Sequence, residues 1–273
     1  MIMEHTGERM IPEISDASIF WEHIYRYRFA IPFIQKKDVL DVACGEGYGS
    51  AGLKAGGAGS VIGVDIDPET CRHALEKYQS YGIEIRQGNS SSLPLADQTV
   101  DVVVSFETIE HVENPNQFLR ECFRVLRNGG TAIISTPNVD VFNPGRDPAH
   151  NIYHCSEMTL TEFRMELAKV FNRFRIYSQQ PRAARWWHPR SLAVRKWGQS
   201  PWTGFRVMSN ISWHSPVYNT DFIKTAREDP VAAICNTEEN FLQSLGNTYR
   251  IRSMSPLSGE QPTYFVAVAK KDN

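Results

Sequence analysis

The sequence predicts an α/β fold, namely a Rossmann-like parallel sheet with an antiparallel last strand, helices on both faces and an inserted cap before the last strand. Two observations predict this class. Short apolar runs alternate with helical patterns along most of the chain, which is typical of a parallel sheet covered on both faces. A glycine-rich turn also follows the first apolar run, as it does in nucleotide-binding α/β domains.

The expected elements follow in order along the chain. A helix is expected around Trp21 to Ile34, with a break at Pro32. Further helices are expected over 68–81 and 116–126, where apolar residues recur at helical spacing. The apolar runs that we expect to form strands are 39–43, 60–66, 83–88, 100–106, 130–137, 171–178 and 263–271.

Composition argues against several classes of protein. A formal charge of -2 over 273 residues does not favour non-specific nucleic-acid binding. The sequence has no run of roughly 18 apolar residues, so a membrane-spanning helix is not expected. The charged N-terminus lacks the apolar run of a secretory signal. The five cysteines are widely spaced without a CxxC pair, so we expect reduced thiols in a cytoplasmic protein and no zinc site built on them.

The glycine turn VLDVACGEGYGS is the most informative segment. Gly45 and Gly47 allow positive φ angles and a close approach of the backbone to a ligand, next to a helix N-terminus. Asp65 ends the next predicted strand, 20 residues after Gly45, where a carboxylate can accept hydrogen bonds from a ribose. Asp41 is an acid within an apolar strand, so we expect it to have a buried partner.

The motifs also separate two cofactors. A dinucleotide turn reads G-x-G-x-x-G, whereas Ser50 stands at the third position here and the pattern is G-x-G-x-G. DVACGEGYG, GVDID, the stretch QGNSSSLPLADQTVDVVVSFETIEHVENP and LRNGGTAIISTPN together resemble class I S-adenosylmethionine (SAM)-dependent methyltransferases over residues 38–138. The resemblance implies a SAM-dependent methyltransferase; an NAD(P)-linked oxidoreductase and a non-catalytic SAM-binding protein are the alternatives.

The resemblance also implies roles for individual residues. Gly45 and Gly47 would line the methionine part of SAM, Asp65 would hold the ribose and Ile66 would pack on the adenine. An acid is usual in the family where Asn89 stands, so the adenine contact there departs from the pattern. The full set of residues implied at the cofactor is Tyr27, Asp41, Ala43, Gly45, Gly47, Asp65, Ile66, Asn89, Ser90, Phe106 and Glu107.

Four parts of the chain follow from this assignment. We expect residues 1–37 to form an N-terminal helical lid and residues 38–180 to form the SAM-binding domain. Residues 181–260 would form an aromatic and basic insertion that caps the acceptor, and 261–273 would hold the final strand of the core sheet. The leader TGERMIPE and the following helix also resemble bacterial methyltransferases associated with cell-surface polysaccharide synthesis.

A hydroxyl acceptor needs a base, and histidines follow the fourth and fifth predicted strands, where the acceptor of an open α/β sheet binds. We favour His154 as general base with Glu157 as its orienting partner. His111 is a further catalytic candidate, although an architectural role explains it as well. Metal ligation is not expected, because the acids and His111 clustered over 107–113 would point apart on one helical turn.

The insertion suggests the acceptor. Five of the six tryptophans lie between Trp186 and Trp213, and no acid stands between Leu167 and Ser215, where nine basic residues do. Tryptophan and arginine suit a phosphorylated or nucleotide-linked glycan, with nucleic acid and a dimer or membrane-surface contact as alternatives. The preferred reaction is O-methylation of a sugar or phosphate group, and another small-molecule acceptor is the alternative. The residues chosen for acceptor binding are Arg185, Trp186, Trp187 and Arg190.

Overall fold

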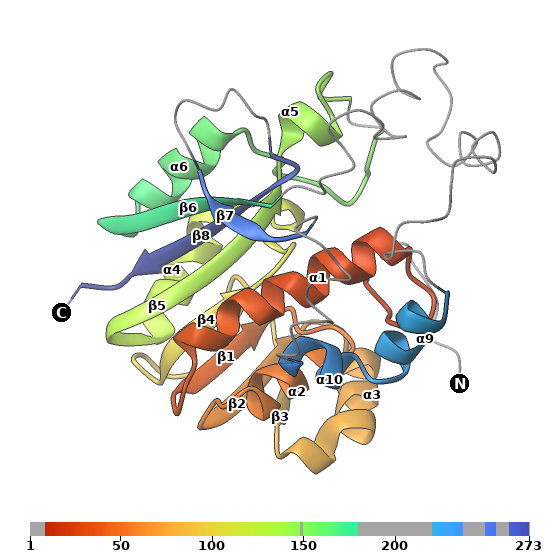
Figure 1. Ribbon diagram of the computed structural model, residues 1–273. Coiled ribbons are helices and arrows are strands. Elements are labelled where there is room, and N and C mark those ends of the chain that lie inside the picture. The colour runs from red at the N-terminus through yellow and green to blue at the C-terminus, as the bar shows by residue number, and fades with distance from the viewer. Residues whose placement is uncertain (1–8, 148–149, 180–219, 237–248, 255–261, 273) are drawn as a thin grey trace, which may run out of the picture.

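The computed structural model describes residues 9–147, 150–179, 220–236, 249–254 and 262–272, and these build one eight-stranded sheet between layers of helices (Figure 1). The strand order is β3-β2-β1-β4-β5-β8-β6-β7. The strands are β1 (Asp38–Val42), β2 (Ser60–Asp65), β3 (Glu84–Gln87), β4 (Val100–Ser105), β5 (Leu126–Pro137), β6 (Arg173–Gln179), β7 (Ile251–Ser253) and β8 (Tyr264–Lys270).

The direction of the strands confirms the predicted fold class. Strands β1 to β5 pair in parallel, and β8 runs antiparallel between β5 and β6. Strand β7 extends the edge by pairing antiparallel to β6, an addition that the sequence analysis did not foresee. The helices, on both faces, are α1 (Ala17–Ala30), α2 (Tyr48–Ala55), α3 (Pro68–Tyr78), α4 (Pro115–Val125), α5 (Val139–Phe142), α6 (Leu160–Ala168), α9 (Thr220–Glu228) and α10 (Pro230–Cys235), with short 3-10 turns η1 (Ile31–Phe33), η2 (Gln79–Tyr81) and η3 (Ile109–His111).

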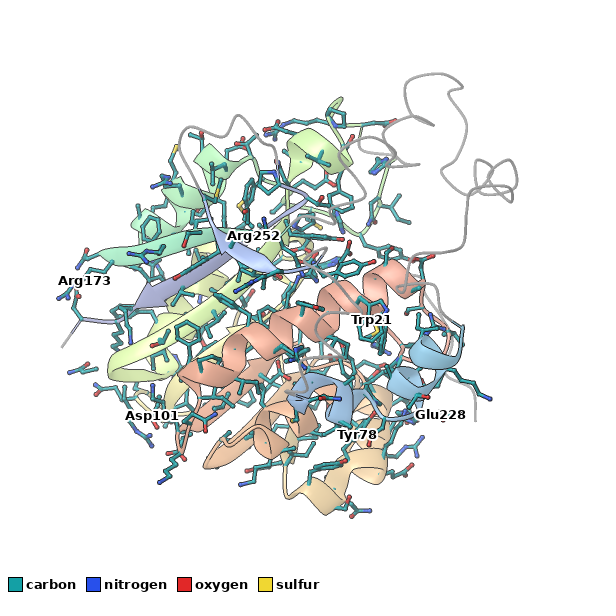
Figure 2. All side chains as sticks on the ribbon, viewed as in Figure 1. Trp21, Tyr78, Asp101, Arg173, Glu228 and Arg252 are labelled. Carbon is teal, nitrogen blue, oxygen red and sulfur yellow. The ribbon has the colours of Figure 1, made fainter. Side chains whose placement is uncertain are left out.

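Alternation along the strands makes two apolar cores. In β1, Val39 faces the core under α1, α2 and α10, whereas Leu40 and Val42 face the core under α4 and α6. Both faces of the central strands are therefore buried, which explains their nearly continuous apolar sequences. In Figure 2, Asp101 and Arg173 lie toward the edge where the parallel strands begin, and Trp21 of α1 lies toward the edge where they end.

The described residues of 220–236 pack against the N-terminal half of the chain. Helix α10 lies on α2, where a Cβ on Gly52 would stand 2.4 Å from Ile234 Cδ1, so a larger residue would displace the Ile234 side chain. The Arg28 guanidinium of α1 also donates to the carbonyl oxygen of Ala233, at 2.8 Å. Within the described part of the chain, no helix has the length and apolarity needed to cross a membrane, and the five cysteines are free thiols.

The strand order reverses between β1 and β4. Strand β1 pairs with β2 on one side and with β4 on the other, so the loops after these strands diverge to opposite faces of the sheet. Ligands of open α/β sheets bind in the crevice that such a reversal opens at the carboxyl ends of the strands. The fold thus predicts where the functional site should be.

Candidate functional site

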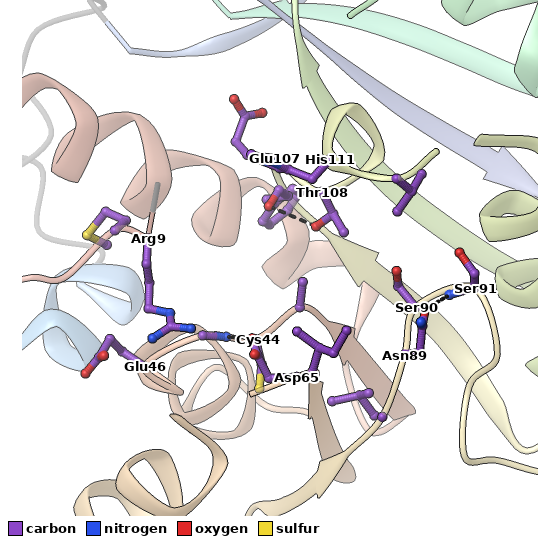
Figure 3. A pocket seen from close by; sticks show the side chains of 18 of the residues that line it. Arg9, Cys44, Glu46, Asp65, Asn89, Ser90, Ser91, Glu107, Thr108 and His111 are labelled. Atoms are coloured by element: carbon purple, nitrogen blue, oxygen red, sulfur yellow. Dashed lines mark hydrogen bonds between the residues drawn. The ribbon is translucent and has the colours of Figure 1, made fainter. Parts of the chain in front are cut away.

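A pocket of about 700 Å³ lies at this crevice (Figure 3). The loops after β1, β2, β3 and β4 form its walls, and α1 and the residues before it close one side. Its volume is in the range of small-molecule and cofactor sites. Among the residues expected at the cofactor, those that line the pocket are Tyr27, Ala43, Gly45, Asp65, Ile66, Asn89, Ser90, Phe106 and Glu107.

The Asp65 carboxylate is fixed at the floor of the pocket by two backbone groups. The N–H of Gly45 donates to Oδ2 at 2.9 Å, and the N–H of Asp67 donates to Oδ1 at 3.1 Å. Asp65 is 7% exposed as a whole residue, yet it lines the pocket. A fixed acidic acceptor of this kind at the end of the second strand suits the two hydroxyls of a ribose.

Gly47 shapes the turn from outside the pocket wall. It begins α2 with a φ of 81°, and a Cβ there would lie 2.8 Å from the Cβ of Ala74 in α3. Because Gly47 has no side chain, α3 can pack closely against the turn. Ala43 and Glu107 also have positive φ angles, 58° and 53°, and both line the pocket. Such conformations are costly for residues other than glycine and gather at functional sites.

The far side of the pocket offers an apolar and a polar surface. Ile66 is 65% exposed there and lines the pocket. Asn89 accepts the N–H of Ser91 through Oδ1, at 2.8 Å, and the two residues turn the loop against the pocket. An exposed isoleucine facing a loop of polar groups suits a flat heterocycle with polar edges.

Asp41 lies directly behind the pocket and has the buried partners that the sequence analysis expected. Alternation along β1 points its side chain toward α1 and α2, where it accepts from Ser50 Oγ at 2.7 Å and from the Tyr27 hydroxyl at 3.3 Å. Burial raises the pKa of Asp41 to about 7, against the lowering effect of these hydrogen bonds. Asp41 holds Tyr27, which itself lines the pocket.

Glu107 links the pocket to a buried arginine. Its Oε1 accepts from Ser135 Oγ at 2.6 Å, and its Oε2 lies 3.6 Å from Arg26 Nη2. Arg26 is completely buried on α1, where its Nε donates to Gln179 of β6 at 2.9 Å and its guanidinium lies over the Tyr264 ring of β8. Arg26 thus connects Glu107 in the pocket with the antiparallel part of the sheet, strands β6 and β8.

The histidines predicted for catalysis come together beside the pocket. His111, in η3, lines the pocket, and its ring meets that of His154 edge to face with the centroids 4.8 Å apart. His154 Nδ1 lies 3.0 Å from Glu157 Oε1, as expected for an orienting partner. Burial acts to raise the pKa of Glu157, but hydrogen bonds with His154 and Asn143 outweigh it and hold that pKa below its ordinary value. His154 and Glu157 line a second hollow of about 250 Å³.

Several residues that line the pocket were not predicted from the sequence, among them Arg9, Met10 and His23 from the N-terminal part of the chain. Arg9 reaches over the glycine turn and pairs with Asp67 at 3.4 Å, and Met10 lies next to it. His23 enters from α1 and contacts the Tyr48 hydroxyl at 3.3 Å. Burial, and then the positive charge of Arg26, lower the pKa of His23 well below its ordinary value. The leader was recognised as a segment that could close over the cofactor, but no spacing in the sequence singles out these side chains.

Comparison with known proteins matches the pocket-forming part of the chain to a methyltransferase domain. Residues 40–134 match the family model described as a methyltransferase domain. The match supports a class I SAM-dependent methyltransferase. The matched residues include the glycine turn, Asp65 and the loop before η3, all of which belong to the pocket, and the match implies SAM as the cofactor.

Similar proteins are known from mycobacteria and thermophiles. The chain is 45% identical over 158 residues to a probable SAM-dependent methyltransferase of Mycolicibacterium smegmatis, and 42% identical over 163 residues to one of Mycobacterium tuberculosis H37Rv. These alignments cover 58% and 59% of this chain but only 60% and 58% of the relatives. A SAM-dependent methyltransferase structure from Thermotoga maritima shares the fold, with a TM-score of 0.56 and 15% identity over 93% of this chain and 92% of that one.

The acceptor-binding residues chosen from the sequence are not placed. Arg185, Trp186, Trp187 and Arg190 lie outside the described residues. The predicted boundaries of the lid and the insertion, and the alternatives of a glycan or a second subunit at the insertion, therefore stay predictions.

Proposed function

We propose that this chain methylates an oxygen atom of a polar small molecule, with SAM as the methyl donor. The observation that supports this best is the contact between His111 on the cofactor pocket and His154 on the neighbouring hollow. This contact links the pocket for the methyl donor to the second hollow. Both lie at the same edge of the sheet, and the second hollow is where an acceptor can bind.

The residues of the pocket fit SAM. Asp65 would hold the ribose, Ile66 would pack on the adenine and the turn at Gly45 would face the methionine part. When bound, SAM supplies an activated methyl group, so the chain has mainly to align the acceptor. Glu107 lines the pocket and is held in place by Ser135 and the buried Arg26.

His154 is the proposed base for an acceptor hydroxyl. Its Nδ1 is held by Glu157, whose second oxygen accepts from Asn143 Nδ2 at 2.8 Å. Because a carboxylate accepts hydrogen bonds, this contact keeps the proton on Nδ1 and leaves the lone pair on Nε2. A sugar or phosphate hydroxyl remains the preferred acceptor, on the strength of the basic and aromatic insertion in the sequence.

The test combines binding with turnover. Calorimetry should show SAM and S-adenosylhomocysteine binding and no comparable binding of NAD. Formation of S-adenosylhomocysteine would then be followed with a sugar phosphate, a nucleotide sugar, a phenol and an amine as acceptors. We expect turnover with a hydroxylated acceptor, and we expect His154→Ala to lower kcat about 100-fold while SAM affinity is kept.

His150→Ala is the matched control, because His150 lies in the same segment but does not line either hollow. It should turn over like the wild type. Absence of SAM binding would disprove the cofactor assignment. Methylation of the amine alone would show that the acceptor atom is not oxygen, and near-normal kcat of His154→Ala would remove His154 from the mechanism.

A further inference from the structure

Two segments distant in sequence meet beside the cofactor pocket. Turn η3 follows β4, and the segment before α6 docks on it through Ser156, whose N–H donates to the Glu110 carbonyl at 2.9 Å and whose hydroxyl donates to the Val112 carbonyl at 2.8 Å. These contacts hold His154 against His111. In the sequence, His111 is clustered only with the acids over 107–113, and no spacing there relates it to His154.

We propose that Glu110, His111 and His154 bind a divalent transition-metal ion of the Zn²⁺ class. Each offers one ligand atom, and the three atoms lie within 4.8 Å of one another. Two imidazole nitrogens and one carboxylate oxygen form one of the ligand sets of catalytic zinc sites, which keep a further position open for water or substrate. Mg²⁺ and Ca²⁺ prefer oxygen ligands, so this set disfavours them.

The surroundings of the two histidines support ligation. His111 Nδ1 lies 3.1 Å from the Tyr153 carbonyl oxygen, and His154 Nδ1 lies 3.0 Å from the Glu157 carboxylate. Both partners are hydrogen-bond acceptors, so each ring holds its proton on Nδ1. The lone pair is then on Nε2, which is the nitrogen that would bind a metal ion. Metal-binding histidines are characteristically oriented in this way by a carbonyl or a carboxylate.

The third ligand is a buried acid that a cation would neutralise. Glu110 is 1% exposed, and Thr136 Oγ1 donates to its Oε2 at a long distance of 3.3 Å. Glu107, a second carboxylate, lies close enough to repel its charge, and Arg26 lies close enough to attract it. A buried carboxylate is costly to ionise, and a metal ion at this point would add a second positive partner to Arg26.

The position suggests what the ion would do. His111 lines the cofactor pocket and His154 lines the second hollow, so an ion between them would hold an acceptor oxygen next to the methyl donor. It would also lower the pKa of a bound hydroxyl. This role rests on the proposed function and makes His154 a ligand rather than the base; metal binding itself does not depend on it.

The experiment measures the metal directly. The full chain is freed of metal with a chelator, dialysed, and titrated by calorimetry with ZnCl₂, MnCl₂ and MgCl₂; Co²⁺ is added separately to record its visible absorption. We expect one Zn²⁺ per chain, weaker Mn²⁺ binding, no Mg²⁺ binding, and an absorption typical of Co²⁺ in a site with nitrogen ligands. His111→Ala, His154→Ala and Glu110→Gln should each weaken Zn²⁺ binding by about 100-fold, and Glu157→Gln by about 10-fold.

Two controls separate this site from others. His150→Ala should bind Zn²⁺ like the wild type, and so should Cys155→Ser, which removes the exposed thiol next to His154. Circular dichroism confirms that each variant is folded, and Glu157→Gln tests the site without removing a ligand. No Zn²⁺ or Co²⁺ binding by the wild type, or unchanged binding by both histidine variants, would overturn the proposal. Metal binding without SAM binding would instead overturn only the proposed function.

Discussion

At the scale of single residues, Asp65 shows how the backbone prepares a side chain for a ligand. Two N–H groups hold the carboxylate, so both oxygens keep one orientation and remain able to accept further hydrogen bonds. We expect Asp65→Ala to weaken SAM binding by roughly 1–3 kcal/mol, the usual loss for charge-assisted hydrogen bonds. Calorimetry with SAM and S-adenosylhomocysteine measures this change.

Asp65→Asn gives the matched comparison. The amide keeps the shape of the side chain but brings a donor where the Gly45 and Asp67 N–H groups need acceptors, so it should also weaken binding. Glu69→Gln, on the exposed first turn of α3, should leave SAM affinity unchanged. Full affinity in Asp65→Ala would place the ribose elsewhere.

At the scale of elements, the packing of α1 on α2 depends on a missing side chain. A Cβ on Gly49 would stand 1.9 Å from Tyr27 Cζ, and the Tyr27 ring is itself packed edge to face against Tyr48 and Phe106. Gly49→Ala should therefore destabilise the fold by about 1–3 kcal/mol and move Tyr27 in the pocket wall. Urea denaturation measures the free energy of unfolding, and calorimetry measures the affinity of the variant for SAM.

Gly145→Ala is the control, because a Cβ there would meet no atom within 4 Å. It should leave stability nearly unchanged. In a Tyr27→Ala background the cost of Gly49→Ala should largely vanish, since the ring that it strikes is gone. An equal cost in both backgrounds would show that the glycine matters for another reason.

At the scale of the whole molecule, Asp41 should make stability depend on pH. Its pKa is raised to about 7 in the folded chain, from an ordinary value of 3.8, so its contribution to stability is full below pH 4 and is lost as the pH rises through 7. The loss is on the order of 4 kcal/mol. Asp41→Asn removes the titration, so its stability relative to the wild type should increase between pH 5 and 8, as measured by urea denaturation.

Asp38, at the start of the same strand, provides the contrast. Hydrogen bonds from Ser60 and Arg127 hold the pKa of Asp38 below its ordinary value, so it is ionised throughout this range. The stability difference between Asp38→Asn and the wild type should therefore stay constant from pH 5 to 8. A constant difference for Asp41→Asn as well would mean that Asp41 does not titrate in this window.

The sequence predicted those parts of the molecule that depend on local pattern. The central strands and β8 follow from apolar runs, whereas the antiparallel direction of β8 was part of the predicted fold class and does not follow from its run alone. The position of Asp65 could be predicted because a strand end and a glycine turn fix it. Asp41 was expected to be buried, but its place behind the pocket wall follows from strand alternation under two helices.

Contacts between distant segments could not be predicted in the same way. His111 and His154 meet because Ser156 docks its segment on η3, and nothing in the spacing of the two histidines shows this. Arg9 and His23 reach the pocket because of the path of the chain before and along α1. Strand β7 is only three residues long, which is too short for alternation to be recognised.

Residues 139–157, which include His154, form a loop whose two ends meet at the end of β5. Asn138 and Met158 form a bridge at its base, and the Asn138 side chain also donates to the Pro262 carbonyl at 2.9 Å. The donor-binding loops after β1 to β4 lie outside this closed excursion. Under the proposed function, exchange of residues 139–157 as one unit should change the acceptor preference and leave SAM binding by the loops after β1 to β4 in place.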